Sequence, residues 1–166
     1  MILCPDEIAI GLDASDRRQA IARAATLLAQ ATRLNEAPIF RALWRREQVG
    51  STALGNGIAI PHARIDGIAR PLDLFAHTAR PIEFRAPDRQ PVSLLYVMLV
   101  PADGSTDAHL QRLALVAQAF SDAAFRTELA ALTEPSAIRR AFAEAENRLN
   151  RMHARAPGRG AAFAAI

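Results

Sequence analysis

The chain alternates between short apolar runs and longer segments in which apolar residues recur every three or four positions. A short apolar run bounded by turn residues is typical of a buried strand, whereas recurrence at three and four is typical of an amphipathic helix. The first pattern predicts strands over Glu7–Gly11, Ile58–Ile60, Leu72–Thr78 and Val92–Val100. The second predicts helices over Asp16–Ala31, Glu36–Gln48, Asp107–Ser121, Ala123–Leu132 and Pro135–Asn147.

The run Val92–Val100 is too uniformly apolar for a strand with one face in water, so we expect it to be central and covered on both faces. The order is a strand, two helices, three strands and then helices. Together these features predict an α/β fold, a three-layer α/β/α sandwich with a mixed β-sheet flanked by helices. Ser15 is the expected N-cap of the first helix, and the spacing of Trp44 from the other apolar residues of its helix predicts a core position.

Length and composition limit the class of protein. The 166 residues fit one domain, expected over 1–150, and the Arg-, Gly-, Pro- and Ala-rich segment 151–166 is expected to be a flexible tail. No run approaches the roughly 18 to 20 apolar residues that span a bilayer, and the start lacks a secretory pattern. Cys4 is the only cysteine, which agrees with a reducing compartment. We therefore expect a cytoplasmic protein with no direct membrane insertion.

The charge argues against a nucleic-acid partner. The formal net charge is +3, and all of the basic side chains are arginines. The 17 acidic residues are interspersed with them, so no basic block is present to follow a nucleic-acid backbone. The composition is compatible with an anionic partner without demanding one.

The segment Arg46–His62 concentrates groups that can bind an anion. Its glycines, Gly57 among them, allow backbone amides to approach a phosphate, and Ser51 and Thr52 add hydroxyl donors. Arg46 offers a guanidinium group that suits phosphate oxygens. The segment ends at His62, which follows a proline at the end of a predicted strand. An imidazole there is a nucleophile that can accept a phosphoryl group.

His109 is the second candidate, because it lies in the first turn of the helix after the central strand. The helix dipole favours an anion there and a neutral imidazole that can donate to it. A surface role remains open unless His109 faces His62. We expect His77 to be a core or edge residue of its strand, and we assign no role to His153.

Several other chemistries are excluded. The glycine loop lacks the Gly-Lys-Ser/Thr element of a nucleotide-binding P-loop, and its glycines precede a strand with the wrong spacing for a dinucleotide fingerprint. No histidines or carboxylates have metal-ligand spacing, and no Gly-x-Ser-x-Gly elbow of a hydrolase is present.

The run from Arg46 to His62 resembles the phosphorylation-site signature of the enzyme IIA domains of the bacterial phosphotransferase system, fructose/mannitol class. The resemblance rests on Arg-Glu, Gly-Ser-Thr and Gly-Asn-Gly-Ile-Ala-Ile-Pro-His, and it extends to Leu94–Pro101 and the helix that begins near His109. It covers about Glu7 to Glu146. Within the class, the motif looks most like the nitrogen-regulatory IIA subtype.

The resemblance implies a transient phosphohistidine at His62, received from a phosphorylated histidine phosphocarrier protein (HPr or a nitrogen-type paralogue). It places the family's second active-site histidine at His109 and its phosphate-contacting arginine at Arg46, with Ser51 lining the pocket. No metal or organic cofactor is expected. Such a domain is a phosphotransferase component, a carrier rather than a turnover enzyme. The sequence departs from the family pattern at Ala63, where glycine is common. The second expected departure is that the short leading segment of the family is curtailed here, because the first predicted strand begins at Glu7.

Three functions remain open at this point. The first is a phosphocarrier with nitrogen-type regulatory output, in which the state of His62 controls the binding of regulatory target proteins. The second is a sugar-specific IIA component that relays phosphate to a fructose/mannitol-type permease. The third is a non-catalytic IIA-like binding module, against which the set of Arg46, Ser51, His62 and His109 argues.

Overall fold

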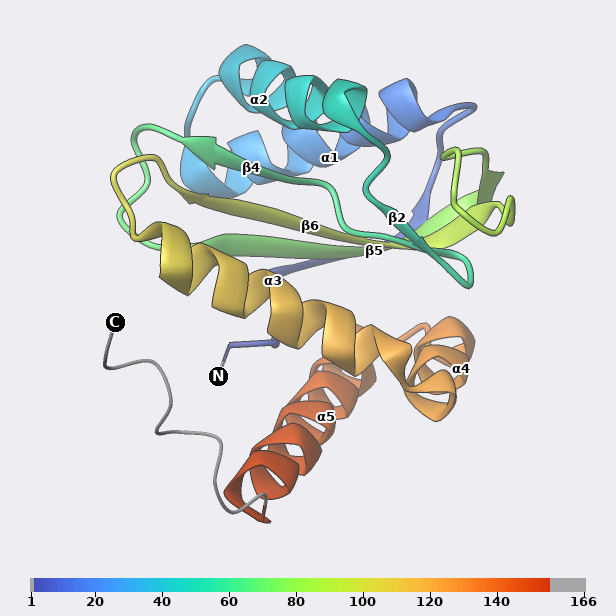
Figure 1. Ribbon diagram of the computed structural model, residues 1–166. Helices are drawn as coiled ribbons and strands as arrows, with labels where there is room; N and C mark the ends of the chain where they lie inside the picture. Colours follow the sequence, from blue (N-terminus) through green and yellow to red (C-terminus); the bar gives the residue numbers. More distant parts are fainter. Residues whose placement is uncertain (1, 156–166) are drawn as a thin grey trace.

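A computed structural model describes residues 2–155. Within this range six strands form one mixed sheet and five helices cover it (Figure 1). The strands are β1 (Glu7–Leu12), β2 (Ala53–Gly55), β3 (Ile58–Ala59), β4 (His62–Ile65), β5 (Leu72–Ile82) and β6 (Val92–Pro101). The helices are α1 (Arg17–Thr32), α2 (Glu36–Val49), α3 (Thr106–Ser121), α4 (Ala123–Ala131) and α5 (Pro135–Arg155).

Strand β6 is the centre of the sheet. The strand order is β1-β5-β6-β3-β2, and β4 also pairs with β6 beyond β3. Strand β6 runs antiparallel to β5 and parallel to β3 and β4, so the sheet is mixed. All residues from Leu94 to Val100 are buried, which confirms the expectation of a central strand covered on both faces.

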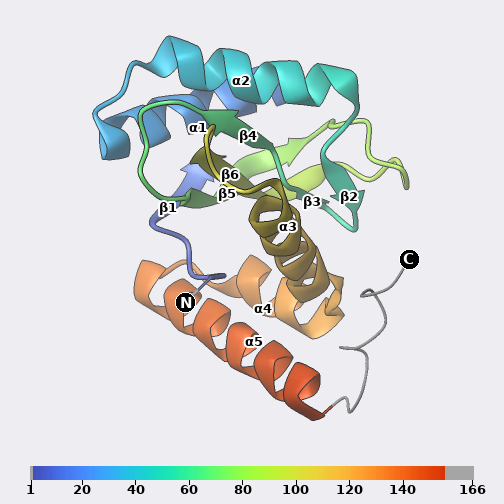
Figure 2. The same cartoon turned by 60° about the vertical axis from the view of Figure 1, so that its left-hand side comes forward.

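The helices form a layer on each face of this sheet (Figures 1 and 2). Helices α1 and α2 cover one face, where Leu28, Ile39 and Leu43 belong to the apolar cluster. Helices α3, α4 and α5 lie on the other face, where Phe120 and Phe142 join a second cluster. The predicted α/β class with helices flanking a mixed sheet is therefore confirmed.

Some element boundaries differ from the sequence-based expectation. The N-cap of α1 is Asp16, whose carboxylate accepts from the amide of Gln19 at 2.8 Å, so the assignment to Ser15 was wrong. Both residues are good N-caps, and the helix begins one position later than expected. Helix α5 continues to Arg155, so the first residues of the expected tail are helical, and 156–166 lie outside the described residues. Trp44 is partly buried against the α1–α2 cluster, as expected.

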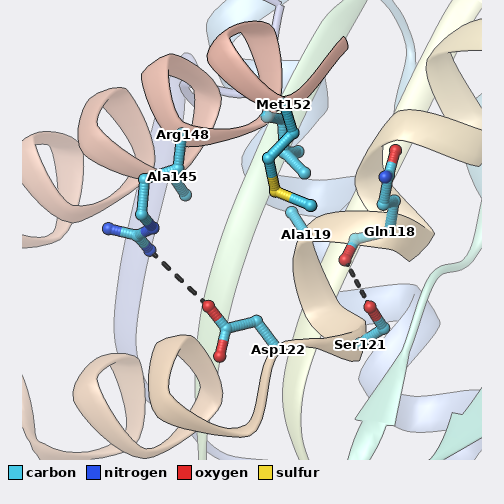
Figure 3. Close-up of a pocket in the computed structure, with 8 residues that line it drawn as sticks. Gln118, Ala119, Ser121, Asp122, Ala145, Arg148 and Met152 are labelled. Carbon is cyan, nitrogen blue, oxygen red and sulfur yellow. Dashed lines mark hydrogen bonds and ion pairs between the residues drawn. The ribbon is translucent and has the colours of Figure 1, made fainter. Parts of the chain in front are cut away.

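Helix α5 packs across the end of α3 and leaves a groove between them (Figure 3). Arg148 of α5 faces the carboxylate of Asp122, the C-cap of α3, at 3.9 Å. The exposed side chain of Met152 lies along the same groove. None of the five helices in the described part of the chain is long and apolar enough to cross a membrane.

Candidate functional site

His62 is the first residue of β4 and lies opposite Met98 of the central strand. Only 8% of its surface is exposed. The sequence predicted this residue just after a strand, whereas it opens a separate short strand that pairs with β6 beyond Pro61. His62 is therefore held by the sheet itself and not by a loop.

Both ring nitrogens of His62 are hydrogen-bonded. Nδ1 lies 2.8 Å from the carbonyl oxygen of Ile60, and the Nε–H group of Arg46 donates to Nε2 at 3.1 Å. A carbonyl can only accept and a guanidinium can only donate, so Nδ1 carries the proton and Nε2 carries the lone pair. These two partners select one neutral tautomer of His62.

The surroundings of His62 also keep the ring neutral. Burial lowers its pKa below the ordinary value of 6.5, and the nearby Arg46 and His109 lower it further, while the hydrogen bond to the Ile60 carbonyl acts in the opposite direction. The balance is a lowered pKa, so His62 is a neutral nucleophile at neutral pH.

Arg46 reaches His62 from the last turn of α2. Its second contact is to the carbonyl oxygen of Gly50 at 2.9 Å, just after the helix ends. The guanidinium group is thus held at the end of its helix and directed at the imidazole. The structure brings Arg46 and His62 together, as the sequence predicted.

His109 comes from the first turn of α3, the helix that lies on the other face of the sheet from α2. The two imidazole rings are 5.6 Å apart between centroids and tilted by 49°. Burial and the neighbouring Arg64 lower the pKa of His109, and its Nδ1 is buried without a hydrogen-bond partner. His109 therefore faces His62, which was the condition for giving it a role.

Ser51 and Thr52 lie beside His62, but their hydroxyl groups already have partners. Ser51 donates to the carbonyl of Phe84 at 2.5 Å. The amide and hydroxyl groups of Thr52 both donate to one carboxylate oxygen of the buried Glu47, at 2.9 and 2.6 Å. In this state both hydroxyls hold the loop after α2, and their expected contact with phosphate remains a prediction.

Gly57 is not brought to His62. It lies in the turn between β2 and β3 with a φ of 77°, and its carbonyl accepts from Ser93 and Leu94 at the start of β6. His62 pairs with Met98, further along the same strand. The positive φ explains the glycine as a turn residue.

Arg64 is a residue of this site that the sequence reasoning missed. It donates to the carbonyls of Ala102 and Gly104 and to the hydroxyl of Thr106, and it lines a depression together with Arg45, His62 and His109. Residues two apart on a strand point to the same side, so Arg64 follows His62 on β4. That alternation would have identified Arg64 if His62 had been predicted inside a strand.

An apolar groove continues from the other side of His62. Along the groove are Leu54 and Leu110, which are 45% and 55% exposed, and the partly buried Leu113. Exposed leucines beside a buried polar site are typical of a surface that contacts another protein.

The remaining histidines lie elsewhere. His77 is half-buried on β5 with its ring against Phe75, at 5.2 Å between centroids, and His153 is exposed on α5. Among residues 2–155, no three histidine, cysteine or acidic side chains come together in a group that could hold a metal ion.

Comparisons with known proteins agree with this arrangement. Residues 1–145 match the family described as "Phosphoenolpyruvate-dependent sugar phosphotransferase system, EIIA 2". A nitrogen regulatory protein of Bradyrhizobium diazoefficiens is 35% identical over 137 residues, which are 82% of this chain and 89% of that protein. The crystal structure of the nitrogen regulatory protein IIA-Ntr from Neisseria meningitidis is 34% identical, with a TM-score of 0.77, and covers 82% of this chain and 92% of that one.

A more distant structure shares the fold. In the complex of mannitol enzyme IIA with phosphorylated enzyme IIB from Escherichia coli, the matching chain has a TM-score of 0.67 and 19% identity. The match covers 83% of this chain and 94% of that one.

The fold and site define a phosphotransferase domain of the enzyme IIA class, in which a buried neutral histidine lies next to an arginine and a second histidine. The chain belongs to the EIIA 2 family of the phosphoenolpyruvate-dependent sugar phosphotransferase system. Its similarity to nitrogen regulatory proteins supports a phosphocarrier role in nitrogen regulation.

Proposed function

We propose that Nε2 of His62 accepts a phosphoryl group from a phosphorylated histidine phosphocarrier protein, either HPr or its nitrogen-type paralogue, in the cytoplasm. Transfer breaks the P–N bond of the donor and forms a P–N bond to Nε2. The phosphorylation state of His62 then decides which regulatory target proteins the domain binds.

The observation that carries this proposal is the tautomer of His62. The Ile60 carbonyl keeps the proton on Nδ1, and the lone pair on Nε2 faces Arg46. A buried imidazole with a lowered pKa and a directed lone pair is prepared to attack phosphorus rather than to bind a proton.

The groups around Nε2 suit the charge that arrives there. A phosphorylated histidine carries about −1.5 to −2 charges, by analogy with other phosphorylated side chains. Arg46 can exchange its bond to Nε2 for bonds to phosphoryl oxygens, and the ring of His109 lies 5.6 Å from that of His62 between centroids. In-line transfer between two imidazoles needs positioning and charge stabilisation more than covalent help, and these side chains supply both.

The regulatory output is supported by two features. The sequence and structural relatives with 34–35% identity are nitrogen regulatory proteins. The exposed leucines of the groove adjoin the site, so the charge on His62 lies next to a surface that can contact a protein. A fructose-specific EIIA component of Haloferax volcanii is 37% identical over 103 residues, which are 62% of this chain, so a relay to a permease is the second candidate.

The test is intact mass after incubation with phosphoenolpyruvate, enzyme I and the histidine phosphocarrier protein of the same organism. We expect the mass of one phosphoryl group to be added, to be labile in acid and to be absent from His62→Ala. The matched control is His77→Ala, which removes another partly buried histidine outside the site and should still be phosphorylated. No gain in mass with a competent donor would contradict the carrier function and favour the binding module.

Capture of partners on the phosphorylated and unphosphorylated forms tests the output. Different sets of retained regulatory proteins would support nitrogen-type signalling. Transfer of the phosphoryl group to a IIB-type cysteine protein would favour the sugar relay instead.

A further inference from the structure

The half of α3 that carries His109 has weaker apolar anchorage than the other half, because Leu113 is only partly buried against the apolar cluster on this face. The buried residues of this helix are Val116, Ala119 and Phe120, all in its second half. No side chain from Thr106 to Leu115 is fully buried. Since apolar burial holds most helices in place, the first half of α3 needs another contact to keep His109 near His62.

A row of paired residues across the sheet provides the place for that contact. His62 of β4 pairs with Met98 of β6, and Met98 pairs with Asp73 of β5. Directly paired residues point to the same face of a sheet. Met98 belongs to the apolar cluster on the α3 side. The side chains of His62 and Asp73, on the two strands that flank Met98, therefore also point toward α3.

Helix α3 meets this row at both ends. His109 lies over His62, and Arg112, three residues later on the same helical face, forms an ion pair with Asp73. The carboxylate of Asp73 is fully buried, and the Arg112 side chain is 16% exposed. The same carboxylate oxygen accepts from the hydroxyl of Tyr96 at 2.7 Å, so the acceptor is itself fixed by the central strand.

This ion pair is a poor source of net stability. Burial raises the pKa of Asp73, and Arg112 and Tyr96 lower it only in part. The other carboxylate oxygen of Asp73 and Nε of Arg112 are buried without partners. A buried pair of this kind often contributes no more to stability than apolar side chains would, although it determines where the two elements meet.

We propose that Arg112 and Asp73 are positioning residues for phosphoryl transfer, because their ion pair holds the first turns of α3 so that His109 faces the reacting Nε2 of His62. This role rests on the proposed function of His62. Arg64 ties the loop before α3 and its first residue to β4, whereas Arg112 joins the body of the helix to the sheet.

The first part of the test is a double-mutant cycle on the full chain, with single-turnover transfer from the phosphorylated phosphocarrier protein as the measurement. Arg112→Met should slow transfer about 10-fold and His109→Ala about 100-fold. The variant that carries both changes should equal His109→Ala within about twofold, since Arg112 acts through His109. A further 10-fold loss in the His109→Ala background, or no effect of Arg112→Met alone, would overturn the proposal.

Two further variants separate position from folding. Arg112→Lys keeps a point charge near Asp73 and should recover part of the rate. The matched control is Arg148→Met, which removes the arginine that faces Asp122 at the other end of α3 (Figure 3) and should transfer at the wild-type rate. If Arg112→Met does not fold, Asp73→Asn combined with Arg112→Met removes both charges together, and it should show the same 10-fold loss.

The second part of the test does not depend on phosphorylation. In NMR spectra the contact between the ring protons of His62 and His109 should weaken in Arg112→Met and persist in Arg148→Met. If the wild-type protein takes no phosphate, the carrier function is contradicted. The contact between the rings of His62 and His109 then still shows whether Arg112 positions His109. If phosphorylation proceeds and the contact is unchanged in Arg112→Met, the positioning role alone is overturned.

Discussion

Helices α2 and α3 each bring one side chain to His62, but the sheet holds the two helices by different means. Helix α2 buries Ile39, Leu43 and Glu47 along its length. Helix α3 has its fully buried residues only in its second half, and two arginines join its first half to the sheet, where Leu113 is partly buried. Both helices therefore combine apolar burial with a buried ion pair, but the buried apolar residues of α2 extend to Leu43, near Arg46, whereas those of α3 begin only at Val116, beyond His109.

Each face of the sheet also has a buried carboxylate, Glu47 on the α2 side and Asp73 on the α3 side, and the two differ in their hydrogen-bond partners. On the α2 side, Glu47 accepts two hydrogen bonds from Thr52 and pairs with Arg17 at 3.2 Å, so its carboxylate is well supplied with donors. On the α3 side, Asp73 leaves one oxygen without a partner. We infer that the Glu47 network stabilises the fold, whereas the Asp73 pair sets a position.

The largest expected effect is on transfer through Arg46. Arg46→Ala removes the donor directed at Nε2, and we expect the transfer rate to fall about 100- to 1,000-fold, as for loss of a preorganised donor to a reacting group. Arg45→Ala, next to it in the same depression, should lose little. Single-turnover kinetics compare the two. Equal losses would mean that general positive charge, and not the Arg46 contact, drives transfer.

The second effect is on stability through Glu47. Glu47→Gln leaves Arg17 without its charged partner and weakens the contacts of Thr52, and it should lower the free energy of unfolding by about 2 to 3 kcal/mol. Urea denaturation measures this change, with the exposed Glu36→Gln in the same helix as control. An unfolding free energy close to that of the control would remove the distinction between the two networks.

The third effect is a pH dependence of the transfer rate, to which Arg46 of α2 and His109 of α3 both contribute. Burial, followed by Arg46 and His109, lowers the pKa of His62, so the transfer rate should stay constant as pH falls to 6.5 and decline only below it. The folded state binds this proton less readily than the unfolded state. The His62 contribution to stability is therefore present above pH 6.5 and is lost as pH falls through the lowered folded value. NMR titration of His62 checks that its pKa lies below 6.5, and the pKa should rise in Arg46→Ala.

The smallest expected effect is the stability change on removing the α3 ion pair. Asp73→Asn combined with Arg112→Met should stay within about 1 kcal/mol of the wild-type protein at neutral pH, even though transfer is slowed. Because burial raises the pKa of Asp73, with Asp6 adding to the rise, the folded state binds this proton more readily than the unfolded state. Relative to the double variant, wild-type stability should fall as pH rises from 3.8 through the raised value. A loss as large as that of Glu47→Gln would show that the pair stabilises the fold after all.

Much of this molecule could be predicted from local pattern. The apolar run of β6 and the three- and four-residue spacing of the helices predicted a mixed sheet between two helical layers, because burial on both faces demands such patterns, although the short strands β2 and β4 were not predicted. Arg46 and His62 were found because they lie in one segment. The strand at His62 was missed because β4 has only four residues, and with it the alternation that places Arg64 at the site.

The sequence alone identified Arg46, His62 and His109 as groups of the site, and it predicted the helices that carry Arg46 and His109. Only the tertiary structure showed that the hydroxyl groups of Ser51 and Thr52 already have partners. Ser51 donates to the carbonyl of Phe84, and Thr52 donates to the buried carboxylate of Glu47. It also decided that His62 and Asp73, eleven positions apart in the chain, lie on either side of Met98 beneath one helix. The reason is physical: side-chain period identifies an element, whereas strand register and helix docking are settled by contacts between residues distant in the chain.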